Sequence, residues 1–94
     1  MNDRDKAAAF LGASLDARLP AIDLHRARDL VTALEQFDRE FDRLLRSNAR
    51  AGRVIYGVGE GVLAREIHKL LAKNTQIIGF KEEESGGSCV VLLA

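Results

Sequence analysis

Apolar residues recur at helical spacing in two long stretches of the chain. The first covers residues 29–51 and is followed by Gly52, a residue type that often ends helices. Its apolar stripe consists of Leu30, Leu34, Phe37, Phe41 and Leu44. The second covers residues 62–73, with apolar positions at Leu63, Ile67, Leu70 and Leu71. The spacing predicts two amphipathic helices, each with one buried side.

Shorter apolar and β-branched runs predict four strands around these helices. They cover residues 21–25, 53–56, 76–81 and 89–93. A third, short helix is predicted in residues 4–14, ending at Gly12. Pro20 disfavours helix in the residue before it and so separates an N-terminal arm, residues 1–19, from a domain of residues 20–94.

The order β-α-β-α-β-β in the domain predicts an α/β fold. We expect a two-layer sandwich, in which two helices cover one face of a four-stranded mixed sheet and the other face stays at least partly open. A crossover helix between two strands implies parallel strands and a right-handed connection. The last two strands are separated by only seven residues, which favours an antiparallel pair.

Composition narrows the class of protein. A chain of 94 residues, 47% apolar and 30% charged, predicts one globular domain whose single cysteine, Cys89, excludes an internal disulfide. No apolar stretch approaches the roughly 20 residues of a membrane span, and no signal-peptide pattern is present, so we expect a cytoplasmic protein without a membrane partner. The net charge is zero, but residues 20–81 hold more bases than acids, which permits a polyanionic partner.

Three glycines at alternate positions, Gly57, Gly59 and Gly61, stand between a predicted strand and the second long helix. Backbone amides at such a turn and at the helix N-terminus form a natural binding place for phosphate. The spacing fits neither the dinucleotide fingerprint nor a P-loop, because no Gly-Lys-Ser/Thr follows. A tight strand-to-helix turn without a ligand is the alternative interpretation.

Side chains alternate across the first predicted strand, so Asp23 and His25 share the face opposite Ile22 and Leu24. In open α/β sheets, ligands gather beyond the carboxyl ends of parallel strands. We therefore expect Asp23 and His25 to lie near the glycine turn. The alternative is a polar pair that caps the next helix or fixes the strand end.

The sequence resembles the Smr (small MutS-related) domain family over residues 20–94. The resemblance rests on Ile22-Asp23-Leu24-His25, on Tyr56-Gly57-Val58-Gly59-Glu60-Gly61, and on Gly86-Gly87 before the last apolar strand. It implies a fold like the C-terminal domain of bacterial translation initiation factor three. It also implies binding of DNA or RNA, and for some members an endonuclease activity that depends on a divalent metal such as Mg²⁺ or Mn²⁺.

Carried onto this chain, the resemblance implies a phosphodiester-cleaving site. His25 is the candidate general base and Asp23 the residue that orients it or holds a metal ion, while Arg26 or Arg28 supplies positive charge. Two departures from the family pattern bear on this hypothesis. Arg26 stands where the family usually has glycine, and Tyr56 replaces the histidine that opens the glycine motif. A tyrosine can stack on a base or bond a phosphate, but it is a poor general base at neutral pH.

The second long helix offers a further basic surface. Arg65, Lys69 and Lys73 follow at four-residue spacing from the glycine turn and predict a phosphate-tracking stripe, while His68 on the same helix is expected to be a half-buried surface residue. Three hypotheses remain open: an endonuclease on structured RNA or branched DNA, a non-catalytic module that binds nucleic acid or the ribosome, and an oligomerisation unit, for example a dimer formed through the apolar strand at residues 89–93.

Overall fold

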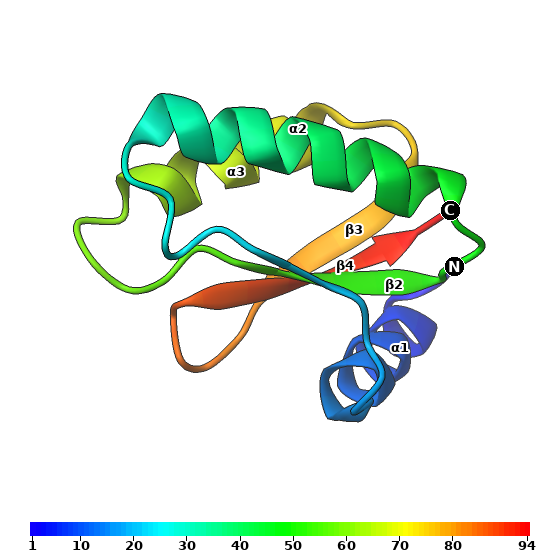
Figure 1. The fold of residues 1–94 in the computed structure, drawn as a ribbon. Coiled ribbons are helices and arrows are strands. Elements are labelled where there is room, and N and C mark those ends of the chain that lie inside the picture. Colours follow the sequence, from blue (N-terminus) through cyan, green and yellow to red (C-terminus); the bar gives the residue numbers. More distant parts are fainter.

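The computed structural model describes residues 1–94 as a four-stranded mixed sheet with three helices (Figure 1). Along the chain the elements are α1 (Asp3–Leu15), β1 (Ala21–Asp23), α2 (Leu30–Arg46), β2 (Ala51–Ile55), α3 (Val62–Lys73), β3 (Ile77–Glu82) and β4 (Ser88–Leu93). The strand order is β1-β2-β4-β3. Strand β1 is parallel to β2, and β4 is antiparallel to both of its neighbours. The predicted α/β class and mixed sheet are confirmed.

The last strand, β4, lies inside the sheet between β2 and β3. Strands β2 and β3 therefore run in the same direction without pairing with each other. Residues 89–93 are all buried, and a strand with apolar side chains on both faces is stabilised most at the centre of a sheet. This position explains the apolar run without a partner molecule, so the sequence argument for a dimer through this strand no longer stands.

Helices α2 and α3 lie over one face of the sheet, and α1 crosses the other (Figure 1). The N-terminal arm thus covers part of the face that the pattern predicted to be at least partly open. Its packing is shallow, because no residue of α1 is fully buried. Phe10 approaches the sheet at Gly79, where an added Cβ would lie 3.8 Å from the phenyl ring. None of the three helices combines the length and the hydrophobicity needed to cross a bilayer.

Several element boundaries differ from the prediction, among them β2, which begins at Ala51 and ends at Ile55. Helix α2 ends at Arg46 and not near residue 51, because the Ser47 hydroxyl donates to the Leu44 carbonyl and accepts from the Ala49 amide, which replaces the next helical bonds. Gly52 is consequently no terminator. It lies in β2, where an added Cβ would come within 2.6 Å of Leu44 Cδ2, so glycine allows β2 to pack closely against α2.

The boundaries of α1 and β1 also shift by a few residues. Helix α1 continues through Gly12 to Leu15, in open space on the surface of the molecule, and Asn2 caps its first turn. Strand β1 ends at Asp23 and not at His25, because the Asp23 carboxylate turns back onto the His25 amide.

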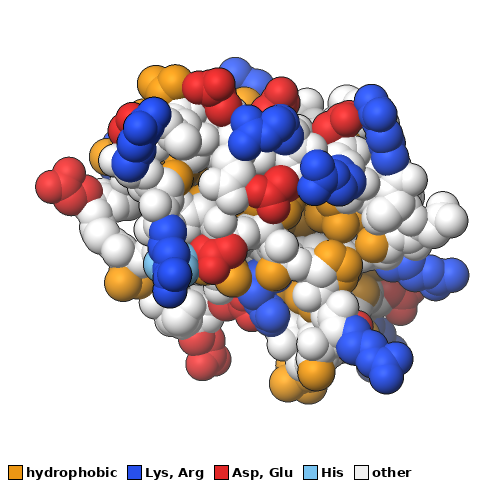
Figure 2. Space-filling model, in the orientation of Figure 1, with side chains coloured by type: hydrophobic (Ala, Val, Ile, Leu, Met, Phe, Trp, Pro, Cys, Tyr) orange, Lys and Arg blue, Asp and Glu red, His pale blue; other side chains and the backbone are white.

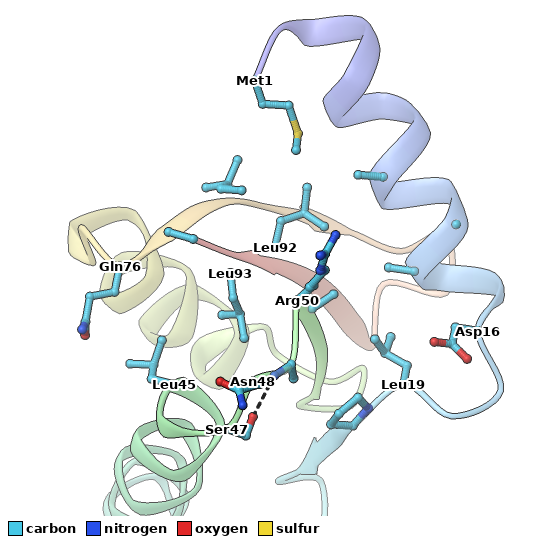
Figure 3. A pocket seen from close by; sticks show the side chains of 18 of the residues that line it. Met1, Asp16, Leu19, Leu45, Ser47, Asn48, Arg50, Gln76, Leu92 and Leu93 are labelled. Carbon is cyan, nitrogen blue, oxygen red and sulfur yellow. Dashed lines mark hydrogen bonds between the residues drawn. The ribbon is translucent and has the colours of Figure 1, made fainter.

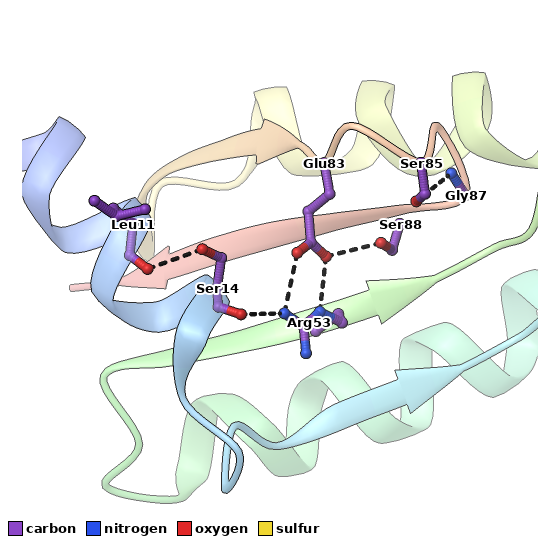
Figure 4. Close-up of polar contacts among 7 residues, drawn as sticks. All are labelled: Leu11, Ser14, Arg53, Glu83, Ser85, Gly87 and Ser88. Atoms are coloured by element: carbon purple, nitrogen blue, oxygen red, sulfur yellow. Dashed lines mark hydrogen bonds and ion pairs between the residues drawn. The ribbon is translucent and has the colours of Figure 1, made fainter.

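A half-buried ion pair joins α1 to the sheet (Figure 4). Arg53 of β2 donates from Nε and Nη2 to the two carboxylate oxygens of Glu83, at 2.7 and 3.0 Å. Its Nη2 also donates to the Ser14 carbonyl at the end of α1, and Ser88 donates to Glu83. The guanidinium holds the pKa of Glu83 below its ordinary value. This cluster fixes the arm, the sheet and the β3–β4 turn together.

Candidate functional site

The three motifs quoted from the sequence lie together at one edge of the sheet. Parallel pairing of β1 with β2 places Asp23 opposite Ile55, so the two chain segments leave the sheet side by side. An added Cβ on Gly57 would lie 3.4 Å from the His25 Cβ. The amides of Tyr56 and Gly57 both donate to the Gly87 carbonyl at 2.9 Å, which joins the Gly86-Gly87 turn to the same edge.

A depression of about 520 Å³ opens where these segments meet. Its lining includes His25 and Arg28 from the β1–α2 connection, together with residues 57–64 from the glycine turn and the first turn of α3. Asp23 and Arg26 do not line the depression, but each contacts His25, which does. The structure therefore brings His25, Arg28 and the glycines Gly57, Gly59 and Gly61 into one concave surface.

The N-terminus of α3 opens into this depression without a cap. Gly61 is the N-cap residue and has no side chain to bond the first-turn amides. By contrast, Asn2 caps α1 and Asp29 caps α2. The first amides of a helix carry partial positive charge and need partners from outside the helix. The α3 amides are therefore available to an anion.

Asp23 and His25 form the ionisable pair at the rim of the depression. Asp23 Oδ1 accepts from both His25 Nδ1 and the His25 backbone amide, and the bond from the imidazole is the main cause that lowers the pKa of Asp23. Gln36 of α2 donates to the Asp23 carbonyl at 3.0 Å and fixes the strand end to that helix. The pair thus ends the strand, as its structural interpretation predicted, while both side chains remain exposed.

The hydrogen bonds around His25 leave one ring nitrogen for chemistry. With Nδ1 bonded to Asp23, neutral His25 carries its proton on Nδ1 and presents Nε2 as an acceptor. Arg26 Nε lies 3.4 Å from that Nε2, a long and weak contact that a substrate can replace. Arg28 lies 3.7 Å from Asp29 and is otherwise free and exposed.

Tyr56 does not take the role that its position in the glycine motif predicted. Its side chain points into the core between the sheet and α3, where it is 6% exposed, and its hydroxyl lies 2.8 Å from His68 Nε2. Burial raises the pKa of Tyr56, so the hydroxyl stays protonated. The same apolar surroundings raise the pKa of Cys89 to about 12. The prediction that Tyr56 stacks on a base is wrong, since its ring is covered.

The basic stripe of α3 is only partly assembled beside the glycine turn. Arg65 is exposed and has no ion pair, while Lys69 lies 3.3 Å from Glu66. Both line a second, shallow depression together with His68 and Phe80. Lys73 lies at the far end of α3, about 12 Å along the helix from Arg65, and lines neither depression. Sequence reasoning missed Phe80, because only the fold stacks it on His68.

No group of three His, Cys, Asp or Glu side chains comes together anywhere in the chain. Asp23 offers one carboxylate oxygen beyond its bonds to His25, and Glu60 lines the depression on the glycine turn. These donors are too few for a resident metal centre. Mg²⁺ is commonly held by one or two carboxylates plus substrate phosphates, and Asp23 and Glu60 are carboxylates of that kind.

Other surfaces of the molecule lack this combination of groups. Figure 2 shows basic and acidic side chains interleaved over α2, where Arg46 pairs with Asp42 at 3.1 Å. The largest groove, about 1160 Å³, lies between α1 and the opposite end of the sheet (Figure 3). Aliphatic side chains dominate its lining, with Asp16 and Arg50 as the only charged residues. It is distant from every motif quoted above.

Comparisons with known proteins agree with the motifs. The chain is 31% identical over 75 residues to the endonuclease MutS2 of Halothermothrix orenii, covering 78% of this chain and 9% of that protein. It is 35% identical over 68 residues to the endonuclease MutS2 of Maridesulfovibrio salexigens, covering 70% of this chain and again 9% of the relative. The chain therefore spans less than a tenth of the length of these relatives.

A solved structure has the same fold. The crystal structure of the Smr domain of Thermus thermophilus MutS2 matches with a TM-score of 0.72 at 24% identity, over 81% of this chain and 99% of that one. Residues 22–94 match the model of the Smr domain family. These residues include the Asp23–His25 pair, the glycine turn and the Gly86-Gly87 turn, and the chain belongs to the Smr domain family.

Proposed function

We propose that this domain binds nucleic acid and holds a backbone phosphate in the depression between His25 and the glycine turn. The observation that carries the proposal is the uncapped N-terminus of α3, which opens into the same depression as His25 and Arg28. Free helix amides, an imidazole and a guanidinium are the groups that bind phosphate oxygens. Arg65 continues this positive surface one turn along α3.

A salt titration tests the binding. Each phosphate contact should contribute about one unit to the slope of log affinity against log salt, so Arg28→Ala and Arg65→Ala should each weaken binding and reduce that slope by about one. Arg46→Ala removes the same charge from α2 and is the matched control. Fluorescence anisotropy with a structured RNA and with a branched DNA measures both quantities. Equal slopes for all four proteins would contradict the proposal.

We further propose phosphodiester cleavage as a second activity, supported by the exposed Asp23–His25 pair and by the name endonuclease that the MutS2 relatives carry. In this mechanism Asp23 holds His25 Nδ1–H, and Nε2 takes a proton from water or a ribose 2′-hydroxyl. The deprotonated oxygen attacks phosphorus, the P–O bond to the leaving oxygen breaks, and that oxygen takes a proton from solvent. The α3 amides and Arg28 stabilise the charge that develops on the phosphate. Arg26 must first leave Nε2, and its side chain is then free to meet a phosphate oxygen.

Cleavage is measured separately from binding, on the same RNA and DNA. His25→Ala should abolish product formation. It should lower the affinity for nucleic acid much less, because the α3 amides and Arg28 remain to bind the phosphate. Reactions run with Mg²⁺, with Mn²⁺ and with a chelator test the metal that Asp23 and the substrate phosphate would hold together. If His25→Ala forms product at the wild-type rate, His25 is not the general base.

A further inference from the structure

A second depression, of about 600 Å³, lies between α3 and the edge strand β3. It begins where the first depression ends, since Gly61 and Ala64 line both. Its remaining lining residues are Arg65, His68, Lys69, Ala72, Phe80 and Glu82. The two hollows are therefore successive positions along one surface that follows α3 away from the glycine turn.

The floor of this second depression carries a fixed aromatic surface. The rings of His68 and Phe80 stack with centroids 5.2 Å apart and an interplanar angle of 29°. The Tyr56 hydroxyl, 2.8 Å from His68 Nε2, holds the imidazole from below, and the tyrosine ring meets it edge-on. Both His68 and Phe80 are half-buried and line the depression. A preformed aromatic surface binds without the entropy cost of ordering it.

Charge around this surface is divided between its two sides. Arg65 and Lys69 project from α3, whereas Glu82 lies on β3. Lys69 is partly neutralised by Glu66, but Arg65 has no acidic partner. A phosphate is therefore favoured on the α3 side and disfavoured beside Glu82. Between these two sides, the two rings are accompanied only by Gly61, Ala64 and Ala72, which carry no charge.

We propose that this depression binds one unpaired nucleotide, with its base on the His68–Phe80 surface and its phosphate beside Arg65 and Lys69. The inference rests on the proposed function and extends it, because the neighbouring phosphate of the same strand occupies the glycine-turn depression. It defines the substrate class as nucleic acid with a single-stranded segment next to a duplex or junction. Base stacking on aromatic side chains is tolerant of sequence, so no base preference is expected.

The test compares a blunt duplex with the same duplex carrying a single-stranded tail. The wild-type chain should bind the tailed duplex about 5- to 10-fold more tightly, the lower end of the usual effect of one stacked base. Abasic sites in the tail should remove this gain while keeping every phosphate. His68→Gln retains a partner for the Tyr56 hydroxyl and Phe80→Leu retains apolar bulk; each should lose the gain while binding the blunt duplex like wild type.

The outcomes separate this inference from the proposed function. Equal affinity of the wild-type chain for both duplexes, or an undiminished gain in both folded variants, overturns the nucleotide subsite alone. Failure of the wild-type chain to bind any of the nucleic acids overturns the proposed function as well. Circular dichroism melts of His68→Gln and Phe80→Leu verify folding before affinity is compared. A gain that survives abasic substitution shows that phosphate contacts account for it and contradicts base stacking.

Discussion

Two ion pairs of the molecule start from neighbouring strands and differ in their surroundings: Asp23 at the end of β1 pairs with His25, and Arg53 of β2 pairs with Glu83 of the β3–β4 turn. His25 and Asp23 have side chains 43% and 49% exposed, whereas Arg53 and Glu83 are 24% and 22% exposed. Arg53 and Glu83 also satisfy each other through two hydrogen bonds and are further bonded to Ser14 and Ser88. The Asp23–His25 pair faces the depression at the uncapped N-terminus of α3. The Arg53–Glu83 pair joins α1, the sheet and the β3–β4 turn.

This contrast shows that a half-buried pair bonded to the surrounding protein stabilises the fold, whereas an exposed pair with unused donors or acceptors can bind a ligand. Arg53 and Glu83 bond to the protein itself, and removing one would leave the other half-buried without an oppositely charged partner. His25 keeps Nε2 for a ligand, and Asp23 keeps one carboxylate oxygen. The same residue classes thus stabilise the fold at one place and offer chemistry at another.

The largest loss of stability is expected from Arg53→Ala. It leaves the Glu83 carboxylate partly buried and unpaired and frees α1 from β2, which should lower the free energy of unfolding by about 2–3 kcal/mol. Urea unfolding measures this loss. Arg28→Ala, an exposed arginine, is the control and should behave like wild type. Equal stability of the two variants would remove the contrast between the two pairs.

Glycine substitutions probe the site from its backbone. Gly57 and Gly61 both have φ of +80°, so alanine at either should cost about 1–2 kcal/mol of unfolding free energy, whereas Gly59→Ala should have little effect. Only at Gly57 would the new Cβ contact His25. Gly57→Ala should therefore also shift the His25 imidazole resonances in NMR spectra, and Gly61→Ala should not. If the His25 resonances were the same in both variants, the proposed contact between position 57 and His25 would be contradicted.

Tyr56→Phe tests the corrected position of the tyrosine. The substitution removes the hydroxyl that bonds His68 and keeps the buried ring, so unfolding free energy should fall by about 1 kcal/mol. Urea unfolding of Tyr56→Phe, His68→Ala and the double variant gives the coupling between the two side chains. Additive losses would show that the hydroxyl does not bond the imidazole.

Acid should weaken the Arg53–Glu83 pair first. The folded pKa of Glu83 lies below its ordinary value of 4.5, so its contribution is fully present above that pH and is lost as pH falls through the folded pKa. Stability of the wild-type chain should therefore decline below about pH 4.5 more steeply than that of Glu83→Gln. Parallel pH profiles of the two proteins would contradict this assignment.

The smallest stability change is expected from Asp23→Asn. Because the pair with His25 is exposed, unfolding free energy should fall by about 0.5 kcal/mol or less, while cleavage, if present, should fall with the loss of the charge that orients His25. Urea unfolding and product formation are measured on the same preparation. A stability loss as large as that of Arg53→Ala would make the two pairs equivalent.

Local patterns predicted much of this architecture. The α3 boundaries and the alternation that separates Asp23 from Ile22 and Leu24 depend on neighbouring residues, and the structure contains both. The predicted apolar stripes are present only in part, because Leu30 of α2 and Leu70 of α3 are exposed. The convergence of the first strand end with Gly57 followed from parallel pairing of consecutive strands.

Long-range contacts decided the rest. The insertion of β4 between β2 and β3 could not be inferred from order alone, and the ring of Tyr56 was buried by α3, an element that follows it in the chain. Arg53 and Glu83 are thirty residues apart, and α1 meets them only after folding. Ser47 ended α2 through a hydroxyl bond that the hydrophobic stripe does not encode.

Backbone amide NMR during titration with a short branched DNA or structured RNA tests the central claim most directly. The proposal predicts that the amides of Gly57, Gly59 and Gly61 and the first turn of α3 shift first and saturate together. The amide resonances of Arg53 and Glu83 should not shift. Shifts confined to the Arg53–Glu83 face, or no shifts at the glycine turn while the complex forms, would contradict the assignment of the phosphate site.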